Sequence, residues 1–332
     1  MPTKLKFGLL LPHFCEYGSA ERCIEGSKKA EAYGFDSVWI RDHLVFEPHG
    51  MEGEDNTHIE GLLILAAVAT VCKKLTLGTG TMISHRHPIH LAQAMAGLST
   101  LCDSNIIMGL GLGTFPHEFE AAGHKKTTLQ DRANIAKINA LLCRRFWAGE
   151  KISYKDDYYD FKDVELKPTP SKNIPIWYGG GTPASCRRAA DYCDGWMPGR
   201  IPTATFNKMV KYLEEQCKLA GRPMITTGAI PITSIDKKRD VALSKVNVKG
   251  LINEGNAPSK KTWVKPASGT FSKVEDIEGL LMAGTPADIA RDTKRYEEAG
   301  LNHIVFDLRF RYADWYQQID LLGQEVLPAV RA

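Results

Sequence analysis

Residues 35–44, FDSVWIRDHL, decide how the rest of the chain is interpreted. The stretch is a short apolar run that ends abruptly on Asp42 and His43. A strand that is buried on both faces of a parallel sheet has this continuous hydrophobic character. In an α/β barrel the carboxyl end of each strand is where side chains enter the active site. The adjacent acid and imidazole are therefore candidate catalytic residues.

The same alternation of apolar strand and helix extends along the whole chain. Strands are predicted at 5–11, 35–41, 75–83, 105–113, 174–178, 194–197, 223–235 and 303–308. Helical spacing fills most of the intervals, and the alternating residues 151–167 predict a surface hairpin. Strands that alternate with helices indicate a parallel sheet. We therefore expect a single α/β domain over residues 1–332, a (β/α)8 TIM barrel. The alternative, an open doubly wound sheet, requires GxGxxG in its first turn, where this chain has PHFCEYGS.

Residues 237–283 interrupt this alternation. They are rich in Lys, Ser and Gly and are longer than a usual connection. We expect an insertion or lid with its own short helices, placed before the last helix–strand unit. That unit begins with a helix at 285–299, which Thr285 can cap and which has Pro286 in its first turn.

The composition excludes several classes of protein. A net charge of +3 over 332 residues is too close to neutral to suggest a nucleic-acid partner. No apolar stretch approaches the roughly 20 residues that span a bilayer, and the apolar run at the start is too short for a secretory signal. The eight cysteines form no CxxC pair. We therefore expect reduced thiols and a cytoplasmic protein.

A glycine loop follows the predicted fifth strand. Gly179, Gly180 and Gly181 precede a helix with Pro183 near its start. Consecutive glycines let backbone N–H groups approach an anion, and the helix adds its dipole and unpaired amides. A phosphate group is the natural ligand; a tight turn without a ligand is the alternative.

Asp42 and His43 can act as an acid/base pair or can orient a redox ring, since an imidazole exchanges protons near neutral pH. In the alternative, Asp42 caps loop amides and His43 only packs. The alternate histidines of His85-Arg86-His87 raise the possibility of a metal site, but later strand ends supply no further ligands. We therefore expect no metal, and a role for Arg86 in anchoring a phosphate or a loop.

An ordered set of motifs resembles the bacterial luciferase-like superfamily. The set comprises VWIRDHL at 38–44, LGTGT at 77–81, RHPIHLAQ at 86–93, GLGLG at 109–113, IPIWYGGG at 174–181, RRAADYCDGW at 187–196, GTPADIA at 284–290 and AGLNHIVF at 299–306. The resemblance covers nearly the whole chain, and the ending of the second strand is most similar to the branch that uses the deazaflavin coenzyme F420.

This resemblance implies a (β/α)8 barrel that binds F420, or alternatively FMN. It places Asp42 and His43 against the ring system of the cofactor. It implies a non-proline cis peptide at Gly80–Thr81 that supports the ring, and phosphate binding at Gly179 to Gly181. We also include Thr114, at the end of the fourth strand, among the expected cofactor contacts.

One departure from the family concerns the proton donor. Members that oxidise sugar phosphates or secondary alcohols carry a Glu just after the glycines of the fourth strand, where this chain has Thr114. The departure argues against those two substrate classes. His117 and Glu118 are the candidates to replace that Glu, and we take His117 as a third catalytic residue.

The sequence therefore predicts an oxidoreductase that transfers a hydride between F420 and a small organic substrate. One alternative is an FMN-dependent monooxygenase supplied by a flavin reductase. Another is a non-catalytic flavin-binding barrel. The resemblance also implies a homodimer.

Overall fold

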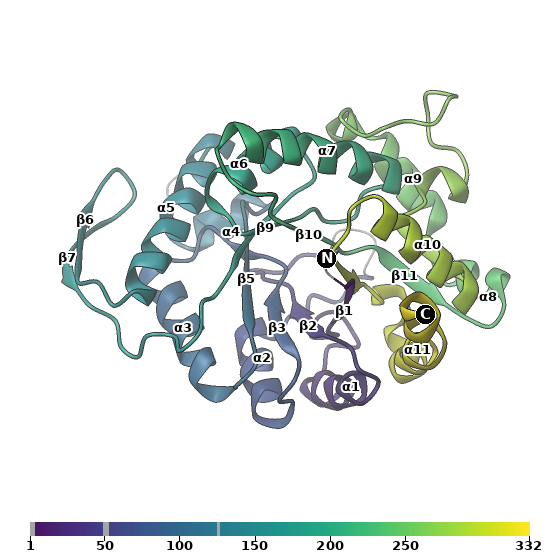
Figure 1. Cartoon of the computed structure of the whole chain (residues 1–332), viewed down its shortest axis with the longest axis horizontal. Helices are drawn as coiled ribbons and strands as arrows, with labels where there is room; N and C mark the ends of the chain where they lie inside the picture. The colour runs from purple at the N-terminus through teal and green to yellow at the C-terminus, as the bar shows by residue number, and fades with distance from the viewer. Residues whose placement is uncertain (1–3, 49–52, 125–126) are drawn as a thin grey trace.

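A closed barrel of parallel strands forms the centre of the molecule, with helices around it (Figure 1). The computed structural model describes residues 4–48, 53–124 and 127–332. In barrel order, the strands described are β1 Lys6–Leu10, β2 Ser37–Ile40, β3 Thr76–Thr79, β5 Ile106–Gly111, β8 Ile176–Gly179, β9 Gly195–Met197, β10 Thr226–Ala229 and β13 His303–Phe306. β13 pairs with β1 and so closes the ring. The predicted (β/α)8 TIM barrel is confirmed.

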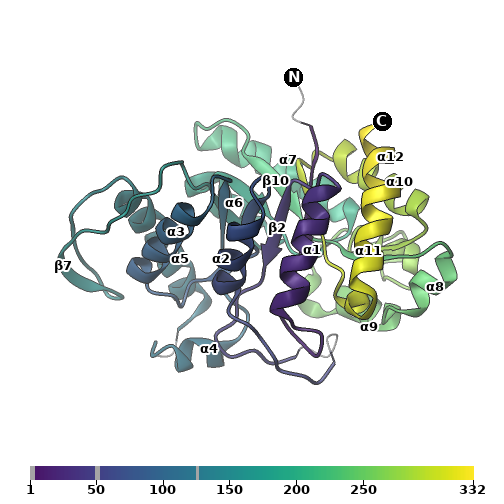
Figure 2. The ribbon, with the colours of Figure 1, turned by 90° about the horizontal axis from the view of Figure 1, so that it is seen from below.

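A helix packs outside the barrel after each of these strands (Figure 1). These helices are α1 Ala20–Ala32, α2 Gly61–Val71, α3 Pro88–Leu101, α5 Leu129–Trp147, α6 Pro183–Tyr192, α7 Thr203–Leu219, α10 Pro286–Glu298 and α11 Trp315–Leu321. Figure 2 shows both termini at one end of the barrel and α4, Pro116–Ala121, at the other. Since α4 follows the carboxyl end of β5, the end of the barrel near α4 is the one that carries the carboxyl ends of the strands.

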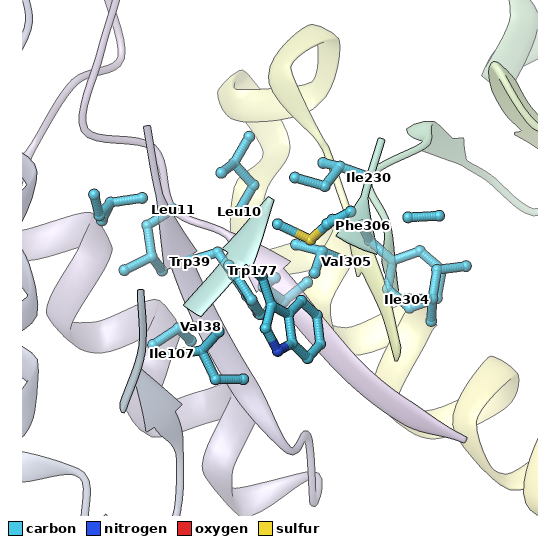
Figure 3. Close-up of a cluster of buried hydrophobic side chains, with 14 of the residues drawn as sticks. Leu10, Leu11, Val38, Trp39, Ile107, Trp177, Ile230, Ile304, Val305 and Phe306 are labelled. Carbon is cyan, nitrogen blue, oxygen red and sulfur yellow. The ribbon is translucent and has the colours of Figure 1, made fainter. Parts of the chain in front are cut away.

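Two tryptophans fill the barrel interior (Figure 3). The rings of Trp39 and Trp177 lie 5.6 Å apart, and both are buried. Glycines on neighbouring strands give them room. A Cβ at Gly78 would lie 2.3 Å from the ring of Trp39, and one at Gly195 would lie 2.5 Å from the ring of Trp177. Bulky interior side chains opposite small ones make this barrel a packed core and not a pore.

The predicted seventh strand, 223–235, is wrong as a single strand. β10 ends at Ala229, and β11, Ile232–Ile235, leaves the barrel to pair with β12, Leu281–Gly284. Pro231 lies between the two strands, and its missing N–H cannot donate to a strand ladder.

Other local predictions are confirmed. The hairpin is β6 Ile152–Lys155 with β7 Asp160–Val164. The stretch 237–283 carries the short helices α8 Arg239–Ser244, α9 Val248–Asn256, η1 Pro258–Lys260 and η2 Val274–Ile277. The Thr285 side chain caps α10 by accepting from the backbone N–H of Asp288.

Candidate active site

A cavity of about 680 Å³ opens at the carboxyl ends of the strands. Most of the residues that the sequence singled out line it, although they come from distant parts of the chain. These are Asp42, His43, Gly80, Thr81, Thr114, Gly179, Gly180 and Gly181. The barrel therefore brings the predicted polar groups together at one site.

The Gly80–Thr81 peptide bond, between β3 and β4 (Met82–Ile83), is cis as expected. Two glycines of the neighbouring strand β5 make room for this segment. A Cβ on Gly109 would lie 2.0 Å from the carbonyl oxygen of Thr79, and a Cβ on Gly111 would lie 2.2 Å from Oγ1 of Thr81. The GLGLG motif at 109–113 is thus explained by close packing against the chain around Thr81.

Asp42 is fixed by Arg86. Its Oδ1 accepts from Nη2 of Arg86 at 2.6 Å, and its Oδ2 accepts from Nε at 2.9 Å and from the backbone N–H of Ile83 at 2.8 Å. Burial alone would raise the pKa of Asp42, but the hydrogen bonds and charge of Arg86 and the Ile83 N–H outweigh it and lower the pKa. Asp42 therefore stays ionised and ties the end of β2 to the loop after β4. The predicted loop-anchoring role of Arg86 agrees with this geometry.

The carboxylate that contacts His43 belongs to Glu118. Nδ1 of His43 lies 3.2 Å from Oε1 of Glu118, and Nη2 of Arg41 lies 3.1 Å from Nε2 of the same ring. Since Arg41 can only donate, Nε2 is the accepting nitrogen and Nδ1–H donates to Glu118. Glu118 is fully buried on α4 and also accepts from the N–H of Leu44 at 2.8 Å. Burial opposes its ionisation, but the hydrogen bonds from His43 and Leu44 lower its pKa overall.

The side chain of His117 contacts the loop after β2 and not the cavity. Among the described residues, those that line the cavity do not include it. Its Nε2 lies 3.1 Å from the carbonyl oxygen of Val45 and 3.7 Å from Oε1 of Glu47, so it holds the loop after β2. The catalytic role expected for His117 has no support in this geometry, whereas Glu118, its neighbour, reaches the site through His43.

Two further histidines pack behind the site. His13 donates through Nδ1 to the carbonyl of Ile59 and accepts at Nε2 from the N–H of Arg41. Burial, followed by the nearby His58, lowers the pKa of His13 to about 3. Burial also lowers the pKa of His58 to about 4. Both imidazoles are therefore neutral at physiological pH, and His13 supports the backbone of Arg41.

The glycine loop leads into α6. Gly180 has a φ of +113°, and a Cβ there would lie 2.6 Å from Oγ of Ser185. Thr182 caps the helix, since its Oγ1 accepts from the backbone N–H of Ser185 at 3.2 Å. The left-handed conformation requires glycine at 180, and it leaves a cradle of backbone beside the helix N-terminus. This cradle fits a phosphate group.

The cavity is also lined by residues that the sequence did not reveal. Glu254, Lys260 and Trp263 come from the stretch 237–283 and line the cavity together with Arg200. Nothing in a Lys- and Ser-rich stretch distinguishes these three from surface residues.

The described residues include no group of three or more His, Cys, Asp or Glu side chains that could hold a metal ion. Among the described residues, no helix is both long enough and apolar enough to cross a membrane.

The family model of luciferase-like monooxygenases matches residues 5–303, and the chain belongs to this family. A relative from Amycolatopsis mediterranei, named F420-dependent glucose-6-phosphate dehydrogenase, is 26% identical over 93% of this chain and 94% of its own.

Solved structures support the fold. An F420-dependent secondary alcohol dehydrogenase in complex with an F420–acetone adduct superposes with a TM-score of 0.81 at 20% identity, covering 99% of this chain and 100% of the other. The FMN-bound oxygenating constituent of 3,6-diketocamphane monooxygenase from Pseudomonas putida gives 0.78 at 16% identity, covering 98% of each chain.

Proposed function

We propose that this protein is an oxidoreductase that transfers a hydride between bound F420 and a small organic substrate. The observation that carries the proposal is that His43, the Gly80–Thr81 peptide and the glycine loop line one cavity at the barrel mouth. The F420-dependent relative, which aligns with almost the whole chain, supports the choice of cofactor. F420 supplies two-electron hydride chemistry when it is bound.

The residues that line the cavity fit such a cofactor. Gly179 to Gly181 and the N-terminus of α6 would hold the phosphate, and Thr114 lines the same cavity. The Gly80–Thr81 peptide would lie against the ring. Asp42, whose two oxygens are taken by Arg86, would position the chain beside the ring and would not exchange protons itself.

His43 would accept or donate the proton of the reaction. Glu118 holds Nδ1–H, so Nε2 would take a proton from a substrate hydroxyl, or return it, once that hydroxyl replaces Nη2 of Arg41 as the hydrogen-bond donor to Nε2. Nη2 of Arg41, 3.1 Å from Nε2, would stabilise negative charge that develops on the same oxygen. Proton transfer at His43 replaces the Glu that is missing at Thr114.

The stretch 237–283 would act as a lid over the substrate. Glu254, Lys260 and Trp263 already line the cavity from that side. The lid, and not the barrel, would then set substrate choice.

We also infer a homodimer through α2 and α3. These adjacent helices, GLLILAAVATV and PIHLAQAMAGLSTL, contain no Asp, Glu, Lys or Arg. Their solvent sides expose Leu63, Val71 and Leu101, with Leu63 67% exposed. An apolar face of this kind on a surface helix is typical of an interface. Sedimentation of the wild type and of Leu63→Glu tests it, and a wild-type monomer would contradict it.

All eight cysteines are free thiols, which supports a cytoplasmic location.

Cofactor titration tests the main proposal. Purified protein is titrated with F420 and with FMN, and the change in absorbance and fluorescence gives each dissociation constant. We expect tighter binding of F420, and reduction of bound F420 by a substrate without oxygen uptake. The FMN-bound structural neighbour favours the alternative, a monooxygenase that receives reduced flavin from a reductase. Oxygen consumption with reduced FMN, together with no binding of F420, would overturn the proposal.

A further inference from the structure

The carbonyl oxygen of Gly180, in the glycine loop, accepts a hydrogen bond from a buried side chain. The donor is Nε1 of Trp196, at 2.9 Å. Trp196 lies on β9 and is fully buried. Among the described residues, those that line the cavity include Gly179 to Gly181 but not Trp196. The indole therefore holds the loop from behind the cavity wall.

This hydrogen bond sets the direction of the next backbone N–H group. The peptide bond between Gly180 and Gly181 is trans. In a trans peptide the C=O and N–H groups lie in one plane and point in opposite directions. Because the carbonyl is turned toward the buried indole, the N–H of Gly181 is turned toward the cavity. None of the described residues accepts a hydrogen bond from that N–H, so it is available to a ligand.

Three consecutive glycines do not hold such an orientation by themselves. The φ and ψ angles of glycine are little restricted, so the peptide between two glycines rotates at low cost. Two contacts limit this freedom. One is the hydrogen bond from Trp196, and the other is the side chain of Ile201, whose Cγ2 would lie 2.8 Å from a Cβ on Gly181.

Aromatic packing fixes the donor itself. The ring of Trp196 stacks on Phe206 of α7, with centroids 5.7 Å apart and planes inclined by 19°. Phe206 makes an edge contact with Tyr296 of α10 at 5.1 Å, and the Tyr296 hydroxyl donates to the carbonyl oxygen of Ile201 at 2.8 Å. Both supports of the glycine loop therefore belong to one buried cluster.

We propose that Trp196 is a positioning residue for the phosphate group of the cofactor. Its indole N–H fixes the peptide between Gly180 and Gly181, so that the N–H of Gly181 donates to a phosphate oxygen. Trp196 does not touch the cofactor. The inference rests on the proposed function and names the residue that makes the glycine loop selective for phosphate; the alternative is that the Trp196 ring only packs.

The test compares cofactors that have and lack the phosphate. FMN and riboflavin differ only in this group. F420 and the deazaflavin FO share a ring system, and FO lacks the phosphate and the tail beyond it. Fluorescence titration of the full-length protein gives a dissociation constant for each. We expect the wild type to bind the phosphorylated member of a pair about tenfold or more tightly, because backbone N–H groups donate to a charged acceptor.

Two changes at position 196 remove the N–H. Trp196→Phe keeps an aromatic ring against Phe206. Site-specific replacement of Trp196 by 3-benzothienylalanine keeps the shape of the side chain, with sulfur in place of N–H, and serves if Trp196→Phe does not fold. Each should reduce the preference for the phosphorylated member about tenfold, with the affinity for riboflavin and FO changed less than about twofold.

Trp147→Phe is the matched control. Nε1 of Trp147 also donates to a backbone carbonyl, that of Ala92 at 3.0 Å, and neither residue is among those that line the cavity. This variant loses the same kind of hydrogen bond elsewhere in the barrel. It should therefore keep the wild-type preference for phosphate.

Three results would overturn the proposal. They are a wild type without a preference for phosphate, a folded protein that keeps the preference without the indole N–H, and an equal loss of affinity for both members of a pair. The last result would show that Trp196 only packs. If F420 and FO do not bind while the FMN and riboflavin pair shows the expected effect, the choice of cofactor is wrong and the role of Trp196 stands.

Discussion

Nδ1 of His43 lies 3.2 Å from Oε1 of Glu118, a carboxylate that is 75 positions away in the chain and fully buried. The adjacent Asp42 has both of its oxygens occupied by Arg86. The acid that orients the imidazole therefore comes from α4, and the acid next to it in sequence has a separate structural task. Each relationship leads to a different expected phenotype.

Loss of Glu118 should slow the chemical step. In Glu118→Gln the amide oxygen can still accept from Nδ1–H, but the charge is gone. A hydrogen bond to a charged group contributes about 1.5–3 kcal/mol, so we expect kcat to fall roughly 10–100-fold with F420 affinity little changed. His43→Ala should fall further, by about 10²–10⁴-fold. Steady-state kinetics and F420 titration of the same preparations separate the two effects.

His117→Ala provides the comparison for these variants. Its imidazole contacts the Val45 carbonyl from outside the cavity. We expect kcat within about twofold of wild type, because no proton passes through this ring. A loss as large as that of His43→Ala would return His117 to the catalytic role that its position in the sequence suggested.

Loss of Asp42 should appear mainly as instability. Asp42→Asn leaves the Arg86 guanidinium with Glu60 alone, at 3.0 Å. Breaking a buried ion pair typically costs about 3–5 kcal/mol, and partial exposure of Arg86 reduces this to about 2–3. Because the pKa of Asp42 is lowered by folding, its contribution is complete above about pH 4. It is lost as the pH falls further, so wild type and variant should converge in acid.

Denaturant unfolding at pH 7 and at pH 3 measures that convergence. Asp191→Asn is the control, since Asp191 forms an exposed ion pair with Lys137 that should contribute little. Equal stability of Asp42→Asn and wild type at pH 7 would contradict the anchoring role.

Two glycines give opposite expectations for the same substitution. A Cβ at Gly111 would lie 2.2 Å from Oγ1 of Thr81, so Gly111→Ala should destabilise by about 1–3 kcal/mol and displace Thr81. Gly97 lies within α3, where an added Cβ would have no described atom within 4 Å apart from its chain neighbours and the nearby backbone of the same helix, so Gly97→Ala should stabilise by about 0.5–1 kcal/mol. Thermal unfolding ranks the two variants, and weakened F420 binding in Gly111→Ala alone would link the packing to the cofactor.

The sequence was sufficient for the barrel because several buried strands lie in apolar runs that stop at polar residues, and helical segments separate them. Val38 to Ile40, followed by Asp42, is the clearest case. The prediction of one continuous seventh strand failed because Ile225 and Ile232 are equally apolar. Only the pairing with β12 shows that β11 leaves the barrel.

The site was predictable only where a strand end supplies the group directly. Asp42, His43 and the glycine loop follow strands, and all line the cavity. The pairing of Glu118 with His43 depends on where the tertiary fold places α4, and the positions of Glu254 and Lys260 depend on the path of residues 237–283. Neither path leaves a periodic signal, because these contacts join segments through a tertiary fold and not along one element.

Buried imidazoles should make the protein sensitive to mild acid. Burial lowers the pKa of His303 to about 3, and its Nε2 lies 2.6 Å from Oγ of Ser37 inside the barrel. An unfolded imidazole titrates near pH 6.5, so below that pH the unfolded state binds more protons than the folded state. The free energy of unfolding should then fall by about 1.4 kcal/mol per pH unit for each such histidine. His13 adds to the same slope.

Denaturant midpoints between pH 6.5 and 5.5 isolate this effect, because carboxylates such as Asp42 stay ionised in both states there. His303→Gln should lower the slope by the contribution of one histidine. Identical slopes for His303→Gln and wild type would show that His303 does not remain neutral in the fold.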